Sequence, residues 1–276
     1  MYKKTKVILI IIAILIAIII SNKTEHFTNT PKSVQIIILC KKANQQLYNA
    51  YMSRFPNQNI IFISDEIPVI KKDNVFHYKD NPEFYGMHSR IKHTSWDKAF
   101  QHLSENNNHD YYWFIEDDVF ISDKNVNKKI DQKYNDDFLI FAWHNFDRYT
   151  KSPINKFWFN SHIDKTLKNV KYFPDKFMSG SLNVFTRLSK KHVQHILNFQ
   201  KKHKRLIFHE MLIPSIAREN DLKIKIMPKK KIKSILSPRP IYVKHNNIEA
   251  KLKAFNEDKV ILAHPAKNWY KIKQNL

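Results

Sequence analysis

The stretch Tyr111–Ile121 reads YYWFIEDDVFI and places three consecutive carboxylates inside an apolar run. Tyr111–Ile115 is a bulky run of aromatic residues ending in a β-branched one, which favours a buried strand. Glu116, Asp117 and Asp118 then bring like charges to the edge of a low-dielectric core, which is costly unless a cation or several donors neutralise them. Hard divalent ions such as Mg²⁺ and Mn²⁺ take carboxylate oxygens, so the triplet is a candidate metal site. The alternative is an acidic turn whose side chains face water.

A second acidic pair, Asp65 and Glu66, follows the apolar run Asn59–Ile63. Open α/β sheets bind ligands at the carboxyl ends of their strands, which makes Asp65 a candidate binding residue. An ordinary acidic turn before Pro68 is the alternative.

Gly180 is one of only two glycines in the chain and lies in the sequence Met178-Ser-Gly-Ser181. A glycine in so glycine-poor a chain indicates a positional requirement, either a positive φ or a close approach of the backbone to another group. A plain turn glycine is the alternative.

The elements that must position these residues alternate between strands and helices from Val34 onward, which is typical of an α/β layered domain. No linker interrupts Val34–Leu276. The expected strands are Val34–Leu39, Asn59–Ile63, Val75–Tyr78, Tyr111–Ile115, Phe138–Trp143 and Leu222–Met227. The expected helices are Ala43–Phe55, Ile91–Leu103, Ser189–His203 and one that begins near Met211.

Composition excludes some classes of protein and leaves others open. The 276 residues are 43% hydrophobic, which is enough to build a core and argues against wholesale disorder. The formal net charge of +22 would suit polyanions, an anionic membrane or phosphorylated small molecules, but the lysines are scattered rather than clustered. The single cysteine, Cys40, cannot form an intrachain disulfide and is expected in the core. No glycine-rich phosphate loop is present, so a P-loop or dinucleotide-binding protein has no support.

The N-terminus carries a candidate membrane anchor. Val7–Ile20 is an unbroken apolar run preceded by three lysines, and no small residues offer a signal-peptidase site before its end. We therefore expect residues 1–21 to form cytoplasmic lysines and an uncleaved single-pass type II anchor, with the remainder across the membrane. Residues 22–33 would form a short stem, and residues 34–276 the catalytic domain.

A strand that ends in Glu-Asp-Asp after preceding strand–helix units resembles the nucleotide-sugar glycosyltransferases of the GT-A fold, whose signature is an acid-x-acid (DXD) motif. The resemblance implies a GT-A-like mixed sheet flanked by helices, preceded by the transmembrane helix. It also implies that Glu116 and Asp117 lie toward the donor and that Asp118 ligates Mn²⁺ or Mg²⁺. Asp65 would contact the nucleoside, and the loop around Gly180 would approach the donor and acceptor sugars.

The same resemblance assigns roles to three downstream residues. Glu210 would be the catalytic base, His264 would complete the metal shell, and Lys267 would add positive charge near the diphosphate. Glu210 has an alternative role as the cap of the helix near Met211, where a carboxylate favours the positive end of the helix dipole. His264 is one of fourteen histidines, most of which are expected to be structural or exposed.

The expected function is that of a membrane-anchored, metal-dependent, inverting glycosyltransferase. It would move a hexosyl or pentosyl group from a nucleoside diphosphate sugar to a glycan or glycoprotein acceptor, in a Golgi- or ER-like lumen if the source is eukaryotic or viral, with no nucleic-acid partner. The alternative is a non-catalytic anchored module that binds anionic glycans or lipid headgroups. The sequence leaves the sugar, the nucleotide base and the acceptor open.

Overall fold

The computed structural model describes residues 32–86, 94–121, 123–140, 142–145, 172–227, 262–263 and 269. The chain divides into two units, Met1–Lys32 and Ser33–Leu276, and the elements below all belong to the second. The predicted anchor, and the stem apart from Lys32 and Ser33, lie outside the described residues. No helix within the described ranges is long and apolar enough to span a bilayer.

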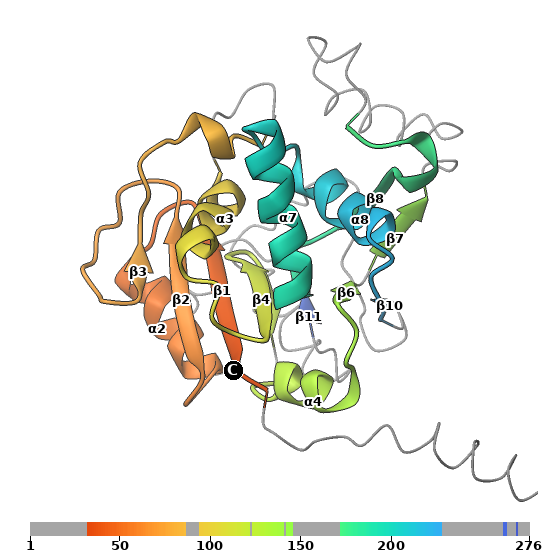
Figure 1. The fold of residues 1–276 in the computed structure, drawn as a ribbon. Helices are drawn as coiled ribbons and strands as arrows, with labels where there is room; N and C mark the ends of the chain where they lie inside the picture. Colours follow the sequence, from red (N-terminus) through yellow and green to blue (C-terminus); the bar gives the residue numbers. More distant parts are fainter. Residues whose placement is uncertain are drawn as a thin grey trace, which may run out of the picture. The chain divides into compact units, whose positions relative to one another are not determined.

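A seven-stranded mixed sheet forms the centre of the second unit (Figure 1). Its spatial order is β10-β6-β9-β4-β1-β2-β3, and every neighbouring pair is parallel except the two that involve β9. The strands are β1 (Val34–Cys40), β2 (Asn59–Ser64), β3 (Val75–Phe76), β4 (Tyr111–Glu116), β6 (Phe138–Ile140), β9 (Phe185–Ser189) and β10 (Ile224–Ile226). The predicted mixed sheet is therefore confirmed, with β4, which precedes the acidic triplet, near its middle.

Two small antiparallel pairs lie beside the main sheet. Strand β5 (Phe120–Ile121) pairs with β11 (Leu262–Ala263), and β7 (Ala142–Asn145) pairs with β8 (Ser179–Leu182). The prediction of one strand over Phe138–Trp143 is wrong, because β6 belongs to the main sheet and β7 to the small one. A continuous apolar run does not reveal where a chain leaves one sheet for another.

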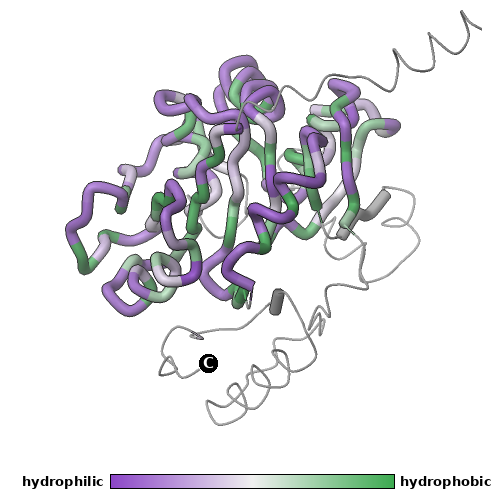
Figure 2. Tube along the Cα trace, turned by 90° about the horizontal axis from the view of Figure 1, so that it is seen from below, coloured by the Kyte–Doolittle hydropathy of each residue, from purple (hydrophilic) through white to green (hydrophobic). Residues whose placement is uncertain are grey.

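Helices cover both faces of the main sheet. Helices α2 (Gln45–Arg54) and α4 (Val126–Lys133) pack on one face, and α3 (Ser95–Glu105), α7 (Lys190–His203) and α8 (His209–Glu219) pack on the other. Short 3₁₀ turns occur at Pro82–Phe84 and Asp175–Phe177. The strands alternate between the two cores, and Figure 2 shows hydrophobic residues along the central strands with hydrophilic ones at the periphery.

Local sequence signals explain where the predicted helices begin. Asn44 caps α2 by accepting a hydrogen bond from the Leu47 backbone N–H at 2.9 Å, and Ser189 caps α7 by accepting from that of His192 at 3.1 Å. Both are polar residues of the type preferred at this position. Helix α7 ends at His203, and its C-cap residue Lys204 adopts the left-handed conformation with φ of 54°.

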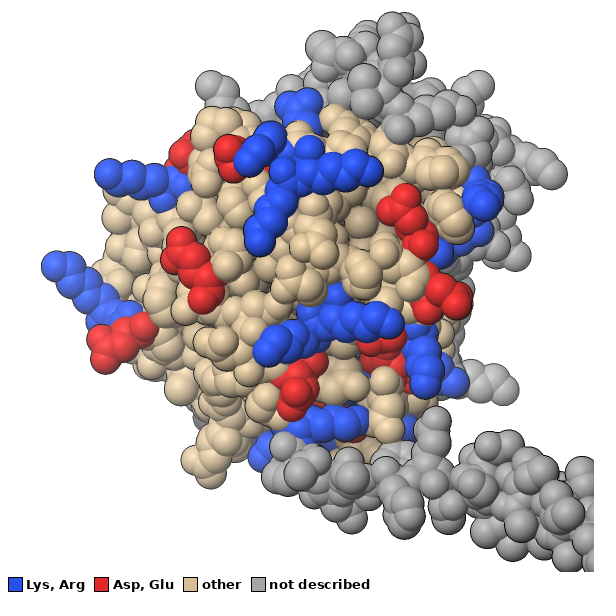
Figure 3. All heavy atoms as spheres, viewed as in Figure 1, with Lys and Arg blue, Asp and Glu red and all other residues tan. Residues whose placement is uncertain are grey.

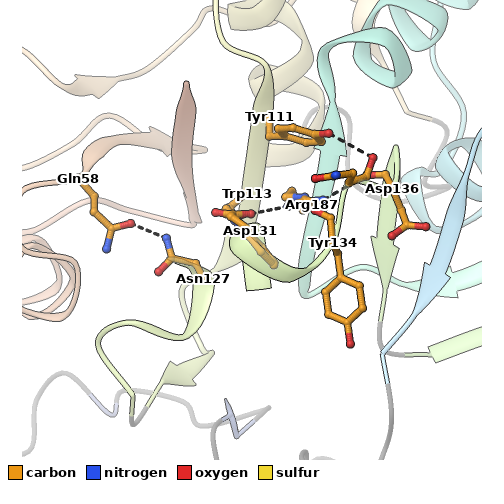
Figure 4. Close-up of polar contacts among 9 residues, drawn as sticks. Gln58, Tyr111, Trp113, Asn127, Asp131, Tyr134, Asp136 and Arg187 are labelled. Carbon is orange, nitrogen blue, oxygen red and sulfur yellow. Dashed lines mark hydrogen bonds and ion pairs between the residues drawn. The ribbon is translucent and has the colours of Figure 1, made fainter. Parts of the chain in front are cut away.

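A buried ion pair between β9 and α4, together with hydrogen bonds from β4, joins the three elements (Figure 4). Arg187 on β9 is 0% exposed, bonds to Asp131 on α4 and donates to the Tyr134 carbonyl at 2.9 Å. Its guanidinium lies 4.1 Å from the centre of the Tyr111 ring. The indole N–H of Trp113 donates to both carboxylate oxygens of Asp131, at 3.2 and 3.1 Å. These contacts fix α4 against the two central strands.

Surface charge follows the scattered pattern expected from the sequence. On the face shown in Figure 3, basic side chains lie interspersed with acidic ones. Cys40 is buried in the core, as predicted.

Candidate functional site

The candidate site lies at the carboxyl edge of the three parallel strands β1, β2 and β4. Cys40 pairs with Ser64, and Leu39 with Glu116, so these strands end side by side. The backbone N–H of Asp65 donates to the Cys40 carbonyl at 2.9 Å, and that of Asp117 to the Leu39 carbonyl at 2.9 Å. The acids that follow β2 and β4 therefore share one edge of the sheet.

The acidic triplet forms a tight turn. Strand β4 ends at Glu116, and the N–H of Val119 donates to the Glu116 carbonyl at 3.0 Å. The buried hydroxyl of Tyr51 lies 2.9 Å from the carbonyls of both residues, and the Trp269 indole N–H donates to the Asp117 carbonyl at 3.2 Å. The rings of Tyr51 and Trp269 meet edge to face at 5.3 Å. The backbone of the turn is thus held by α2 and by a residue near the C-terminus.

The side chains of the triplet do not continue the alternation of a strand. Asp117 accepts a hydrogen bond from the Lys41 backbone N–H at 3.4 Å, so its carboxylate lies toward the end of β1. Regular alternation stops because the chain turns after Glu116. The side chains of Glu116, Asp117 and Asp118 are all half-buried, so the like charges lie at the margin of the core.

Glu116 is bound by a tryptophan from the neighbouring helix. The indole N–H of Trp96 on α3 donates to Glu116 Oε1 at 3.0 Å. One face of the indole stacks on Phe114, with ring centres 5.0 Å apart, and the ring of His209 also stacks on it, at 4.4 Å. Trp96 therefore contacts both the end of β4 and the start of α8.

Glu210 lies in the first turn of α8 and is electrostatically coupled to Glu116. Burial raises the pKa of Glu210 well above its usual range, and the charge of Glu116 raises it further. The helix begins at His209 with Phe208 as its N-cap, and Phe208 makes no side-chain capping bond. Two carboxyl groups that are far apart in the sequence are thus brought together at the carboxyl edge.

Asp65 is a second carboxyl group with a perturbed pKa. Burial raises its pKa to about 7, against the opposing effect of Lys98 and with additional increases from Asp97 and Asp117. Asp65 Oδ1 is buried and accepts no hydrogen bond from the described part of the chain. Lys98, which is 2% exposed, donates to the backbone carbonyl of Asp65 and lies 4.0 Å from Asp80. Helix α3 therefore contacts the ends of both β2 and β4.

Gly180 lies inside β8 and is buried. Neither glycine of the chain has a positive φ, so the first of the two requirements considered for Gly180 is excluded, and its position inside β8 excludes a plain turn. The hydroxyl of the adjacent Ser181 donates to Asn183 Oδ1 at 2.7 Å, and Asn183 donates to the His209 carbonyl at 3.1 Å. The glycine segment is thus linked to the residue that precedes Glu210.

His264 and Lys267 lie outside the described residues. Ala263, which precedes His264 in the sequence, pairs with Phe120, two residues after Asp118. Within the described ranges, no three His, Cys, Asp or Glu side chains come together as a metal-binding group. The chemistry of the described acids still fits a hard divalent cation, because carboxylate oxygens are its preferred ligands and neighbouring carboxylates add to burial in raising the pKa values of Asp65 and Glu210.

Sequence reasoning did not identify Tyr51, Trp96 or Trp269 as parts of the site. Tyr51 and Trp96 fall within the expected helices Ala43–Phe55 and Ile91–Leu103, and neither they nor Trp269 were given a role in the site. A usable signal was present, since a buried tyrosine hydroxyl or tryptophan N–H usually finds a hydrogen-bond partner. The partner itself could not be named, because the residues concerned are distant in sequence.

No protein-family model matches the sequence, and a search of curated proteins found no match. Among solved structures, the bifunctional glycosyltransferase WbbM is similar at 12% identity with a TM-score of 0.44, over 86% of this chain but only 46% of that protein. The galactosyltransferase LgtC, in complex with donor and acceptor sugar analogs, is similar at 10% identity and a TM-score of 0.41, over 83% of this chain and 86% of that one. Mouse xyloside xylosyltransferase 1 is similar at 11% identity and a TM-score of 0.41, over 85% and 97%. These three similarities extend over most of this chain, at 10–12% identity.

Proposed function

We propose that this protein is a GT-A-type glycosyltransferase that uses a divalent cation to transfer a sugar from a nucleoside diphosphate sugar to a hydroxyl group of a glycan or glycoprotein. One observation carries the proposal: Glu116 and Glu210 are coupled at the carboxyl edge of the sheet, beside Asp65 and the acidic turn. Half-buried carboxyl groups with perturbed pKa values at such an edge are typical of a catalytic site.

The proposed site residues form a donor-binding set and a metal-binding set. In the proposal, Asp65, Glu116, Asp117 and the backbone at Gly180 contact the donor, while Asp118 and His264 hold Mn²⁺ or Mg²⁺. A bound divalent cation supplies positive charge that offsets the charge developing on the leaving diphosphate. Lys267 would add to that positive charge.

Glu210 is the proposed general base. A sugar hydroxyl is a weak nucleophile, and a carboxylate that accepts its proton helps the new bond to the anomeric carbon to form. As that bond forms, the bond to the diphosphate breaks and the nucleoside diphosphate leaves from the opposite face, which inverts the anomeric centre. Burial and the charge of Glu116 raise the pKa of Glu210 above its usual range, and a carboxylate with a raised pKa binds a proton more tightly, which suits a base.

The proposal includes a membrane location that the sequence alone supports. The apolar run Val7–Ile20 behind three lysines would act as a single-pass type II anchor. The catalytic unit would then lie on the side of the membrane opposite the lysines.

A donor panel tests the proposed function directly. The protein is incubated with UDP-, GDP- and CMP-sugars in the presence of Mn²⁺, and release of the sugar or the nucleotide is measured. We expect slow hydrolysis of at least one donor, which a chelator abolishes. If no donor is bound or hydrolysed while the protein binds anionic glycans or anionic vesicles, the non-catalytic module is the correct function.

A further inference from the structure

Trp96 bridges the two acidic elements of the candidate site. Its indole N–H donates to Glu116 Oε1 at 3.0 Å, and its ring stacks on His209, the residue that precedes Glu210. We propose that Trp96 is a positioning residue, which fixes the Glu116 carboxylate relative to the first turn of α8. The inference rests on the proposed function, because the role of Glu116 toward the donor is taken from it.

The stacking of Trp96 fixes the direction of its hydrogen bond. The indole is 3% exposed, and its plane lies within 10° of the rings of both Phe114 and His209. A ring that stacks on two neighbours in this way cannot turn about its χ angles without losing both contacts. The N–H therefore points in one direction, and it selects one orientation of the Glu116 carboxylate.

The same indole also contacts the segment that carries Glu210, because it stacks on His209. His209 is held by its ring against Trp96 and by its backbone carbonyl, which accepts a hydrogen bond from Asn183 at 3.1 Å. Asn183 is 0% exposed and belongs to the segment just after β8. Trp96 and Asn183 together set the position of the first residue of α8, and Glu210 follows it directly.

If Trp96 only contributed to packing, its replacement would affect kcat/KM in the same way with and without Glu116. Trp113 provides the matched control for this alternative. Trp113 is also a buried tryptophan whose N–H donates to a carboxylate, that of Asp131, at 3.1 Å. It lies on β4 like Glu116, but its bond is to α4 on the opposite face of the sheet. Replacing either tryptophan by phenylalanine removes one N–H donor and keeps an aromatic ring.

The experiment is a double-mutant cycle on donor hydrolysis. The variants Trp96→Phe, Glu116→Ala and the combination of both are compared with the wild type, using the donor from the panel that the wild type hydrolyses fastest. We expect Trp96→Phe to lower kcat/KM about tenfold or more, since a hydrogen bond to a charged group is lost. In the Glu116→Ala background we expect the same substitution to change kcat/KM less than about twofold, because its target is absent.

Trp113→Phe should instead change kcat/KM by the same small factor in the wild type and in the Glu116→Ala variant. The proposal is overturned if Trp96→Phe lowers kcat/KM by an equal factor with and without Glu116, because that result describes a packing role. Melting temperatures of all variants show whether each protein is folded, and Trp96→Met, which also lacks a hydrogen-bond donor, replaces Trp96→Phe if the latter is not.

A second measurement keeps the inference testable if no donor is hydrolysed. The full-length protein is labelled with ¹⁵N-tryptophan, and the indole resonances of Trp96 and Trp113 are assigned from the two phenylalanine variants. We expect Glu116→Gln to shift the Trp96 resonance and to leave that of Trp113 in place. That outcome without donor turnover would support the positioning role and contradict the proposed function, whereas an unmoved Trp96 resonance would overturn the positioning role itself.

Discussion

Glu210, in the first turn of α8, lies close enough to Glu116, at the end of β4, that the charge of Glu116 raises its pKa. Their proximity follows from the order of the sheet, in which β4 lies between β1 and β9 and α8 packs on the face that carries α3. In the proposed function Glu210 would accept the proton of the acceptor hydroxyl and Glu116 would contact the donor, so their proximity would bring both substrates together. The pair therefore supports a single centre of reaction at this edge.

Glu210→Gln should slow sugar transfer by a factor of about 10²–10⁴, because the amide keeps the volume of the side chain but loses its basicity. Donor binding, measured by calorimetry, should be nearly unchanged, and the melting temperature should stay near that of the wild type. Glu219→Gln is the matched control, since Glu219 is exposed at the other end of α8. If Glu210→Gln transferred sugar at a near-normal rate, Glu210 would contribute only to the stability of α8.

Asp118→Asn should abolish donor hydrolysis and weaken Mn²⁺ binding, because one carboxylate ligand is lost. Removal of one of several like charges should leave the melting temperature of the metal-free protein equal or higher. Asp117→Asn is the comparison, since the Asp117 carboxylate lies toward Lys41, and it should change Mn²⁺ affinity less. Normal turnover by Asp118→Asn in the presence of a chelator would contradict the metal site.

Asp65 should make the stability of the protein depend on pH. Its pKa is raised from 3.8 to about 7, so the folded state binds this proton more tightly than the unfolded state does. The resulting stabilisation is fully present below about pH 4 and is lost as the pH rises through 7. Asp65→Asn should therefore be more stable than the wild type at pH 8, by on the order of 1–3 kcal/mol, with the difference shrinking toward pH 5.

Urea unfolding at several pH values measures this effect. Asp73→Asn serves as the control, because Asp73 is exposed. Equal pH dependence of unfolding in the wild type and in Asp65→Asn would show that the Asp65 carboxyl group is not perturbed by folding.

Much of the fold could be predicted from the sequence because its signals are local. The run Tyr111–Ile115 became β4, and the segment Ala43–Phe55 became α2 with an asparagine cap. Strand β9 was not predicted, although its antiparallel pairing makes the sheet mixed. Its residues Thr186 and Arg187 are polar yet buried, and only their distant partners make that burial possible.

The candidate site could be predicted only as a set of separate acids. A carboxylate triplet after an apolar run indicates an edge of the sheet, which the structure shows for Glu116. The contacts of Trp96 and Trp269 with the triplet could not be predicted, because hydrogen bonds between distant segments leave no periodic pattern in the sequence. The proposed roles of His264 and Lys267 stay predictions, since both residues lie outside the described ranges.

Arg187→Met should lower the free energy of unfolding by about 3–5 kcal/mol, because it leaves the largely buried Asp131 carboxylate without its cationic partner. The double variant Arg187→Met/Asp131→Leu should recover part of this loss, since no buried charge remains. Lys129→Met, which breaks the exposed pair with Asp123, should cost less than about 1 kcal/mol. Chemical denaturation measures all three, and equal losses for the single and double variants would contradict this account.

Deleting Met1–Ile20 should release the protein from membranes into the soluble fraction with donor turnover retained. The reason is that the sheet begins at Val34, well after the deleted run. Fractionation followed by the donor assay measures both properties. An inactive, aggregated product would show that the deleted segment contributes to the folded protein.

The attachment of Ser33 to Asp110 has a practical consequence. The backbone N–H and the hydroxyl of Ser33 donate to the Asp110 carboxylate at 2.8 and 3.0 Å. These two hydrogen bonds lie where β1 and β4 start. The acidic turn lies at the other end of β4, about 17 Å away at the rise of an extended strand. A dye or a resin attached at this end of the sheet would therefore leave the acidic turn uncovered, which makes it the place to immobilise the protein for surface-based binding measurements.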